Sequence, residues 1–320
     1  MKIGILGTAD IALRRFLPAL QKSNLFTFAG IASRNIEKTK TFIEQFGGQA
    51  YQGYDALLED REIDAVYLPL PPALHYEWGK KALLAGKNVF MEKPFCANFV
   101  ETEELLEIAE QRELAVHENY MFLYHRQLDK IKELLLDGSL GQIRLLRISF
   151  GFPKRGEHDF RYHKDLGGGA ILDCGGYPVR LALELLGDTA CMKQARLCRP
   201  ENYEVDLFGC ATLENKDGIC AQISFGMDNA YQCQLEIWGS KATLIAPRIF
   251  TAPPNLGIKL MLVQGQQEQT ISVKEDDHFL HSLEVFAAEV EETTLQKKQR
   301  MAILKQAQLI EEIQNSPQKS

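Results

Sequence analysis

Hydrophobic residues in the first third of the chain occur in short continuous runs, and helical periodicity follows most of them. Such runs, ending at a glycine, a proline or a polar residue, are typical of strands buried on both faces of a parallel sheet. The predicted strands span residues 2–6, 26–32, 63–70, 89–91 and 114–118. Because strands and helices alternate without a break, the pattern predicts an α/β domain with a doubly wound parallel sheet.

From residue 143 on, the pattern changes to longer segments in which apolar and polar residues alternate. This period indicates strands with one buried and one exposed face, so we expect an α+β domain with an open, mostly antiparallel sheet. An open sheet face favours association of copies, and we expect a homodimer or homotetramer formed through that face. The predicted strands span residues 143–152, 192–198, 205–213, 219–225, 232–238, 242–247, 256–263 and 268–273.

The change of period also predicts the domain organisation. We place an N-terminal domain at residues 1–121 and a C-terminal domain at residues 122–320. An amphipathic C-terminal helix at about residues 298–314 is expected to pack back on the body of the protein.

Composition limits the classes of function. The chain has 320 residues, 45% hydrophobic and 25% charged, which suits a globular protein with a sizeable core. A net charge of −7 opposes nucleic-acid binding. No stretch approaches the roughly 20 apolar residues of a membrane span, and the first apolar run is too short for a signal peptide. Seven cysteines without a C-x-x-C pair indicate neither a disulfide framework nor a zinc site, so we expect a cytoplasmic protein.

A glycine turn joins the first predicted strand to its helix. The sequence GTADIA is a G-x-A-x-x-A variant of the dinucleotide-binding fingerprint, in which helix N–H groups face a pyrophosphate. A strand-turn-helix without a ligand is the alternative, because Ala9 leaves less room than glycine would. The candidate cofactor contacts are Gly7, Thr8, Ala9, Asp10 and Ile11.

The second predicted strand ends at Ser33 and Arg34. NAD-binding domains usually carry an acid here for the ribose hydroxyls, whereas a hydroxyl and a guanidinium suit the 2′-phosphate of NADP(H). We therefore expect NADP(H) to be preferred over NAD(H).

Further candidate residues follow the next two strands. Leu70, Pro71 and His75 lie where a crossover helix would meet the cofactor, although His75 could instead bond only to backbone. Glu92 and Lys93 precede Pro94, and proline keeps the residue before it extended. Lys93 should thus lie at the carboxyl edge of the sheet, where open parallel sheets bind ligands. The alternative for Lys93 is a lysine in a surface turn.

A second group of candidate residues surrounds the helix predicted at residues 171–186. Asp173 and Tyr177 are four residues apart and share one helix face. Asp173 could instead cap the helix, and Tyr177 could be a core residue. Upstream, Arg161 and Tyr162 lie on a loop able to reach a substrate, with surface chemistry as the alternative.

A further group, His278, His281 and Glu284, is spaced so that its members would share one face of a helix. The spacing of a catalytic zinc site is absent, so we assign no metal.

Taken in this order, these motifs are similar to those of the Gfo/Idh/MocA oxidoreductase family. The E-K-P stretch at Lys93 is the most specific of them. The segments GTADIALRRFLPAL, VYLPLP and LGGGAILDCGGYPVR resemble the NDP-hexose 3-ketoreductases within that family.

The resemblance implies an N-terminal Rossmann domain, a C-terminal open-sheet domain and hydride exchange between a nicotinamide and a sugar carbon. It matches Lys93 to the family's active-site lysine and Tyr177 to its proton donor. We expect a reductase of a nucleotide-activated keto-sugar that uses NADPH. A dehydrogenase of a free sugar or dihydrodiol, and a non-enzymatic NADP-binding regulator, are the alternatives.

Overall fold

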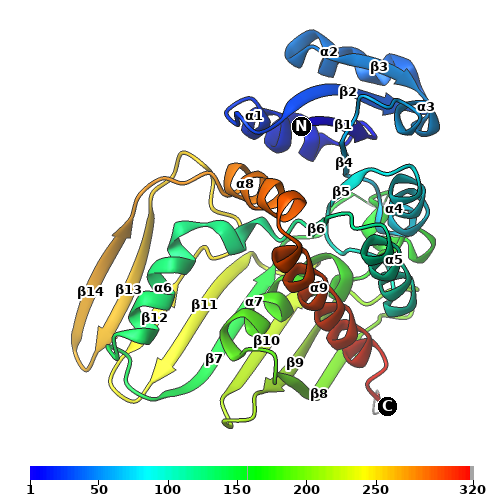
Figure 1. Cartoon of the computed structure of the whole chain (residues 1–320). Coiled ribbons are helices and arrows are strands. Elements are labelled where there is room, and N and C mark those ends of the chain that lie inside the picture. Colours follow the sequence, from blue (N-terminus) through cyan, green and yellow to red (C-terminus); the bar gives the residue numbers. More distant parts are fainter. Residues whose placement is uncertain (157, 318–320) are drawn as a thin grey trace. The chain divides into compact units, whose positions relative to one another are not determined.

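The computed structural model describes residues 1–156 and 158–317. They form two compact units, whose elements are labelled in Figure 1. Unit 1 contains Met1–Asn119 and Phe279–Ala307, and unit 2 contains Tyr120–His278 and the chain from Gln308 on. The domain boundary at residue 121 stays a prediction.

Unit 1 contains a six-stranded parallel sheet in the order β3-β2-β1-β4-β5-β6. The order reverses between β1 and β4, and this reversal is where doubly wound sheets open a crevice for ligands. The predicted α/β fold is confirmed. The strands are β1 (Lys2–Leu6), β2 (Thr27–Ser33), β3 (Gln49–Gln52), β4 (Ala65–Leu68), β5 (Asn88–Met91) and β6 (Val116–Glu118).

The crossovers of unit 1 are helical. The helix after β1 begins as a π-helical turn at Ala12–Phe16, where Phe16 is fully buried and stacks on Tyr67 of β4 with ring centroids 3.8 Å apart. The α-helices are α1 (Leu17–Leu20), α2 (Lys40–Phe46), α3 (Tyr54–Leu58), α4 (His75–Leu84) and α5 (Phe99–Gln111).

A C-terminal helix completes the core of unit 1. Helix α8 (His278–Glu291) buries Phe279, Leu283 and Phe286, which are spaced along one face of a helix. Phe286 packs on Phe90 of β5, with ring centroids 5.3 Å apart. The helix therefore lies against the parallel sheet, although it is far from that sheet in sequence.

Unit 2 contains an eight-stranded sheet in the order β14-β13-β12-β11-β7-β10-β9-β8. All neighbours are antiparallel except β7 and β10. The predicted open, mostly antiparallel sheet is thus confirmed. The strands are β7 (Ile143–Gly151), β8 (Cys191–Cys198), β9 (Phe208–Glu214), β10 (Cys220–Gly226), β11 (Gln232–Gly239), β12 (Thr243–Ala246), β13 (Ile258–Gln264) and β14 (Gln267–Val273).

Two α-helices of unit 2 accompany this sheet, and the long C-terminal helix ends in the same unit. Helix α6 (Arg126–Leu136) follows a 3-10 turn at Met121–Tyr124. Short 3-10 turns at Phe160–Tyr162 and Lys164–Leu166 and a π-helical turn at Ile171–Gly175 lead into α7 (Gly176–Leu186), which packs on β7 and β10. The last helix, α9 (Thr293–Gln314), starts before the predicted residue 298, and its end lies in unit 2.

Candidate functional site

The glycine turn after β1 has the backbone shape that a dinucleotide requires. Gly7 has a φ of +105°, which only glycine adopts without strain, and its N–H donates to Ala32 O over 2.9 Å. A Cβ on Gly7 would lie 2.7 Å from Leu70 Cδ2, so the turn is also tight. Thr8, Ala9 and Ile11 are partly exposed and Asp10 is exposed, so the start of the helix is open to solvent.

The end of β2 holds Ser33 and Arg34 in different environments. Ser33 is buried, and its Oγ accepts from Asn35 N over 3.2 Å. The Arg34 backbone is fixed by Gln52, whose Nε2 donates to Arg34 O over 2.9 Å, while the arginine side chain is exposed. The fixed backbone places an accessible guanidinium at the carboxyl edge of the sheet.

His75 is fully buried between two backbone carbonyls. Its Nδ1 lies 2.7 Å from Pro94 O, and its Nε2 lies 2.7 Å from Leu70 O. Burial lowers the pKa of His75, and the contacts with the two carbonyls oppose this shift. Backbone bonding was the alternative that the sequence left open for His75, and these contacts connect the Leu70-Pro71 turn to the residues around Lys93.

The Glu92-Lys93-Pro94 turn is held by side chains on three sides. Glu92 Oε1 accepts from Tyr67 Oη and from Asn119 Nδ2, both over 2.7 Å. Burial raises the pKa of the Glu92 carboxyl. The residues after Lys93 are also held, because Phe95 N donates to Glu118 Oε1 over 2.8 Å and His75 Nδ1 contacts Pro94 O. Lys93 itself is partly buried, and it belongs to this fixed turn at the edge of the sheet.

Tyr177 lies in an aromatic box within unit 2. The residue is 7% exposed, and the nearest ring centroids are those of Phe150 at 5.0 Å and Tyr120 at 5.2 Å. The rings of Phe122 and Phe250 also pack around it. The hydroxyl lies 4.0 Å from Met121 Sδ, a weak acceptor. The box orients the phenol ring within unit 2.

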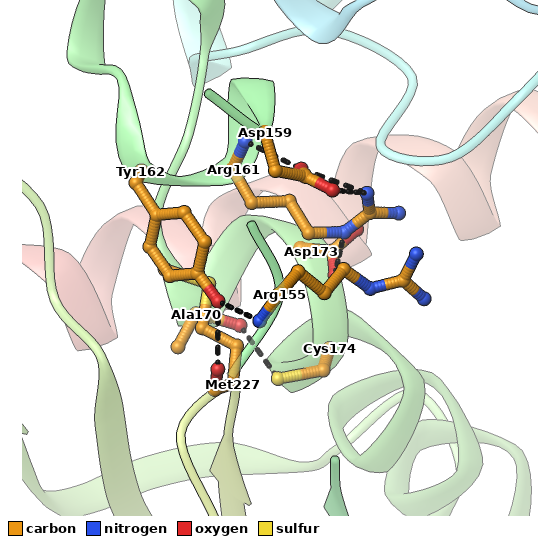
Figure 2. A network of polar contacts seen from close by, with 8 residues as sticks. All are labelled: Arg155, Asp159, Arg161, Tyr162, Ala170, Asp173, Cys174 and Met227. Atoms are coloured by element: carbon orange, nitrogen blue, oxygen red, sulfur yellow. Dashed lines mark hydrogen bonds and ion pairs between the residues drawn. The ribbon is translucent and has the colours of Figure 1, made fainter. Parts of the chain in front are cut away.

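Asp173, one turn before Tyr177, forms an ion pair with Arg161 (Figure 2). Arg161 Nε donates to Asp173 Oδ2 over 2.7 Å, and Nη1 donates to Asp159 Oδ1 over 3.1 Å. Burial opposes the charge of Arg161, but the two carboxylates outweigh it and raise the pKa of the guanidinium. The structure thus joins two predicted site residues, Arg161 and Asp173, that are separated by a glycine-rich loop.

Tyr162 fixes the loop that carries Arg161. Its hydroxyl donates to Met227 O over 3.1 Å and accepts from Arg155 N over 2.8 Å, as Figure 2 shows. Tyr162 as a whole is 7% exposed. A direct contact between Tyr162 and substrate stays a prediction, and the structure gives this residue a supporting position.

The glycine loop lets the start of the helix approach Arg161 closely. A Cβ on Gly168 would lie 2.4 Å from Arg161 O, and Gly169 N donates to the same oxygen over 2.9 Å. The first turn of the helix is capped by Asp206, whose Oδ2 accepts from Ile171 N over 2.8 Å. Capping, the alternative role left open for Asp173, therefore belongs to Asp206.

Sequence reasoning missed Tyr67, Asn119 and Asp206. Asn119 directly follows β6, in the segment V-H-E-N. Because side chains alternate between the two faces of a strand, the sequence could have placed His117 and Asn119 on the same face. Tyr67 lies in the apolar run of β4, and this position indicated only a core residue. No pattern in the sequence connects Asp206 with the helix that it caps.

Two of the three residues considered for a metal contact each other. His281 Nδ1 lies 2.9 Å from Glu284 Oε2. Within residues 1–156 and 158–317, no group of three or more His, Cys, Asp or Glu side chains could hold a metal ion. In the same residues no helix is both long and apolar enough to cross a membrane.

Two family models match this chain. Residues 1–120 match a model described as an oxidoreductase family with an NAD-binding Rossmann fold, and residues 128–245 match a GFO/IDH/MocA C-terminal domain. The chain belongs to the GFO/IDH/MocA oxidoreductase family. The resemblance inferred from the motifs is confirmed.

Curated relatives of this chain include reductases of a dTDP-linked sugar, and a D-xylose 1-dehydrogenase (NADP(+)) from Haloferax volcanii is more distant, at 30% identity. A dTDP-3,4-didehydro-2,6-dideoxy-alpha-D-glucose 3-reductase from Actinomadura kijaniata is 38% identical over 98% of this chain and 94% of its own length. The enzyme of the same name from Streptomyces violaceoruber is 44% identical over 79% of this chain and 74% of its own length.

Solved structures of the family match the whole fold. A 3-ketoreductase from Actinomadura kijaniata, in complex with NADP and TDP-benzene, is 37% identical, with a TM-score of 0.95. The match covers 99% of this chain and 98% of that one. Forms of the same 3-ketoreductase with one tyrosine or one lysine substituted match as well, also in complex with TDP-benzene and NADP.

Proposed function

We propose that this protein reduces a keto group of a nucleotide-activated deoxysugar, with NADPH as the hydride donor. The observation that carries the proposal is the similarity to 3-reductases of a dTDP-linked dideoxysugar over nearly the whole chain. Lys93 and Tyr177 support it, because the turn of Lys93 is fixed through Glu92, the ring of Tyr177 packs among aromatic rings, and both residue types suit transfer of a proton to a carbonyl oxygen.

NADP(H) is the proposed cofactor, and the turn after β1 fits it. The positive φ of Gly7 and the exposed start of the helix suit the pyrophosphate of NADPH. The bound cofactor would supply the hydride for the carbonyl carbon. Ser33 and the exposed Arg34 suit a 2′-phosphate, which supports a preference for NADP(H) over NAD(H). Leu70 and Pro71 would line the same edge.

Tyr177 is the proposed proton donor, and Lys93 is proposed to assist it. As the carbonyl oxygen gains negative charge, the phenol donates its proton, and the lysine ammonium favours the phenolate that remains. The aromatic box keeps water from the phenol ring and fixes its direction. In the matching 3-ketoreductase, the substituted lysine and tyrosine lie the same number of residues apart as Lys93 and Tyr177, which supports equivalent roles.

Asp173 and Arg161 are the proposed sugar-binding residues of unit 2, and Tyr162 is proposed to support them. Two carboxylates beside one guanidinium give this group a net negative charge, which reduces the attraction of Arg161 for a diphosphate. The pair of Arg161 and Asp173 offers both donors and acceptors, as sugar hydroxyls require. We therefore assign the pair to the sugar and assign Tyr162 to holding their loop.

The open face of the unit 2 sheet is the proposed interface of a homodimer or homotetramer. Alternate residues of β11 are buried, while Trp238, which points the other way, is 49% exposed. Phe208 on β9 is 44% exposed on the same face. Trp238→Arg should shift the protein toward the monomer in sedimentation, and a wild-type monomer at all concentrations would contradict the proposal.

A cytoplasmic location is proposed for the same protein. All seven cysteines are free, which suits a reducing compartment.

The function is tested with purified protein, NADPH and a dTDP-linked 3-keto-deoxysugar. We expect NADPH oxidation that depends on the sugar, and NMR of the product should show the keto carbon converted to a carbinol. Tyr177→Phe is the control for reduction by a contaminating enzyme. Failure of the wild-type protein to reduce any nucleotide-linked keto-sugar would overturn the proposal.

A further inference from the structure

A chain of buried side chains connects helix α8 to the turn that carries Lys93. His117 Nδ1 lies 2.8 Å from Glu289 Oε2, and His117 Nε2 lies 2.9 Å from Ser282 Oγ. Ser282 Oγ donates to Asn119 Oδ1 over 2.9 Å, and Asn119 Nδ2 donates to Glu92 Oε1 over 2.7 Å. His117, Asn119 and Ser282 are 0% exposed and Glu289 is 3% exposed, so the chain runs through the core of unit 1.

From His117 on, the hydrogens of this chain point toward Glu92. The single hydroxyl hydrogen of Ser282 goes to Asn119, so Ser282 Oγ can only accept from His117, and His117 Nε2 must carry a hydrogen. The other ring nitrogen, Nδ1, faces a carboxylate oxygen of Glu289, and a lone pair there would repel it. A hydrogen therefore lies between Nδ1 and Oε2, shared by the two side chains.

The direction of the chain decides which end of the Asn119 amide faces Glu92. With Oδ1 bound to Ser282, the amide N–H₂ points to the Glu92 carboxylate. A rotated amide would place two oxygens against each other in a buried setting, where such a contact is costly. Glu92 directly precedes Lys93, and the bonds of Tyr67 and Asn119 fix its side chain.

We propose that Ser282 and Glu289 of α8, acting through His117 and Asn119, are positioning residues for the Glu92-Lys93 turn. The proposal rests on the proposed function, since it assumes that Lys93 serves the reduction. None of the four side chains needs to touch the substrate. Their effect is to hold the Glu92 carboxylate, and with it the backbone of Lys93, in the orientation that the reaction uses.

Three substitutions distinguish orientation from general packing. Ser282→Ala removes the hydroxyl that connects His117 to Asn119. Glu289→Leu removes the partner of His117 Nδ1, so that Nε2 can present a lone pair to Ser282 and the hydrogen bonds of the chain can reverse their direction. Glu289→Gln keeps the direction, because its amide N–H₂ can donate to Nδ1 while Nε2 keeps its hydrogen. Glu284→Gln on the exposed face of α8 is the matched control.

We expect Ser282→Ala and Glu289→Leu to lower kcat by about 10- to 100-fold, the scale of a small misplacement at a reacting centre. In these two variants, KM for the sugar and Kd for NADPH should change by less than about threefold. Glu289→Gln and Glu284→Gln should keep kcat within about threefold of the wild-type value. Because both substitutions break the same chain, kcat of the double variant Ser282→Ala/Glu289→Leu should lie within about threefold of kcat of Ser282→Ala. Equal kcat in Glu289→Gln and Glu289→Leu, or multiplied losses in the double variant, would overturn the proposal.

Proton NMR tests the chain without turnover. Wild-type protein should show a strongly deshielded ring N–H signal of His117, lost in Glu289→Leu and kept in Glu284→Gln. Absence of this signal from the wild type would overturn the proposal. If the wild-type protein reduces no nucleotide-linked keto-sugar, the proposed function fails. The NMR signal then still decides whether the chain has the stated direction.

Discussion

Arg161 donates its Nε hydrogen to Asp173 over 2.7 Å, which links the loop after β7 to the helix that carries Tyr177. Asp173 precedes Tyr177 by one helical turn, and its side chain is 9% exposed. The proposed proton donor and the proposed sugar-binding pair are therefore set by one rigid element.

The first prediction concerns this ion pair. Asp173→Asn should lower kcat/KM for the sugar by about 10- to 100-fold, because a hydrogen bond to a charged group contributes about 1.5 to 3 kcal/mol. Kd for NADPH should stay unchanged. Asp159→Asn is the comparison, since its contacts with Arg161 are longer, at 3.1 and 3.3 Å. A larger loss of kcat/KM in Asp159→Asn than in Asp173→Asn would contradict this assignment.

The second prediction concerns the choice of cofactor. Arg34→Ala should weaken NADPH binding by roughly tenfold to a hundredfold and leave NADH binding nearly unchanged, because only NADPH carries the 2′-phosphate. Fluorescence titration with both cofactors measures the two values of Kd. Lys38→Ala, which removes an exposed cation one turn further on, is the control. Equal affinity of the wild-type protein for NADPH and NADH would argue against a role of Arg34 in selection.

The third prediction concerns the phenol. Tyr177→Phe should retain NADPH binding and lower turnover by about 10² to 10⁴, the usual contribution of a positioned general acid. Tyr231→Phe is the control, because that tyrosine is exposed and bonds to Thr251. Near-normal turnover of Tyr177→Phe would mean that the proton comes from elsewhere.

The fourth prediction concerns Lys93. Lys93→Ala should lower kcat at least as much as Tyr177→Phe, because it removes the ammonium that favours the phenolate as well as a substrate contact. Lys80→Ala, which removes an exposed ion pair with Glu104 in the same unit, is the control for loss of a lysine. If Lys93→Ala kept normal kcat, its assignment as the active-site lysine would be wrong.

Much of the fold follows from local pattern. Each strand of the unit 2 sheet overlaps a predicted segment, because apolar and polar residues alternate along it. Strand β3 was missed, since Gln49–Gln52 is short and carries glutamine at both ends. Helix α3 was missed with it, because five residues give too little periodicity. Both elements depend on tertiary packing.

The sequence offered candidate site residues where chemistry and spacing coincide, at Lys93, Asp173 and Tyr177, and their roles stay predictions. Partners remote in sequence were not predicted. Ser282 and Glu289 lie more than a hundred residues from His117, at separations of 165 and 172, and no local rule connects them. His75 shows a further limit, because its residue type suits a ligand contact as well as the two backbone contacts that the structure gives it.

The most direct test of the account compares kcat/KM of the wild-type protein, with NADPH, for a dTDP-linked 3-keto-deoxysugar and for the same sugar without its nucleotide. Contacts with remote parts of a substrate orient the reacting carbon, so truncation should lower kcat as well as affinity. Xylose, glucose and a dihydrodiol, tested with NADP⁺ in the oxidative direction, represent the alternative class. The account predicts that kcat/KM for the nucleotide-linked keto-sugar exceeds all the others by at least about 100-fold, the equivalent of about 2.7 kcal/mol. Higher kcat/KM for an unactivated sugar or a diol would contradict it.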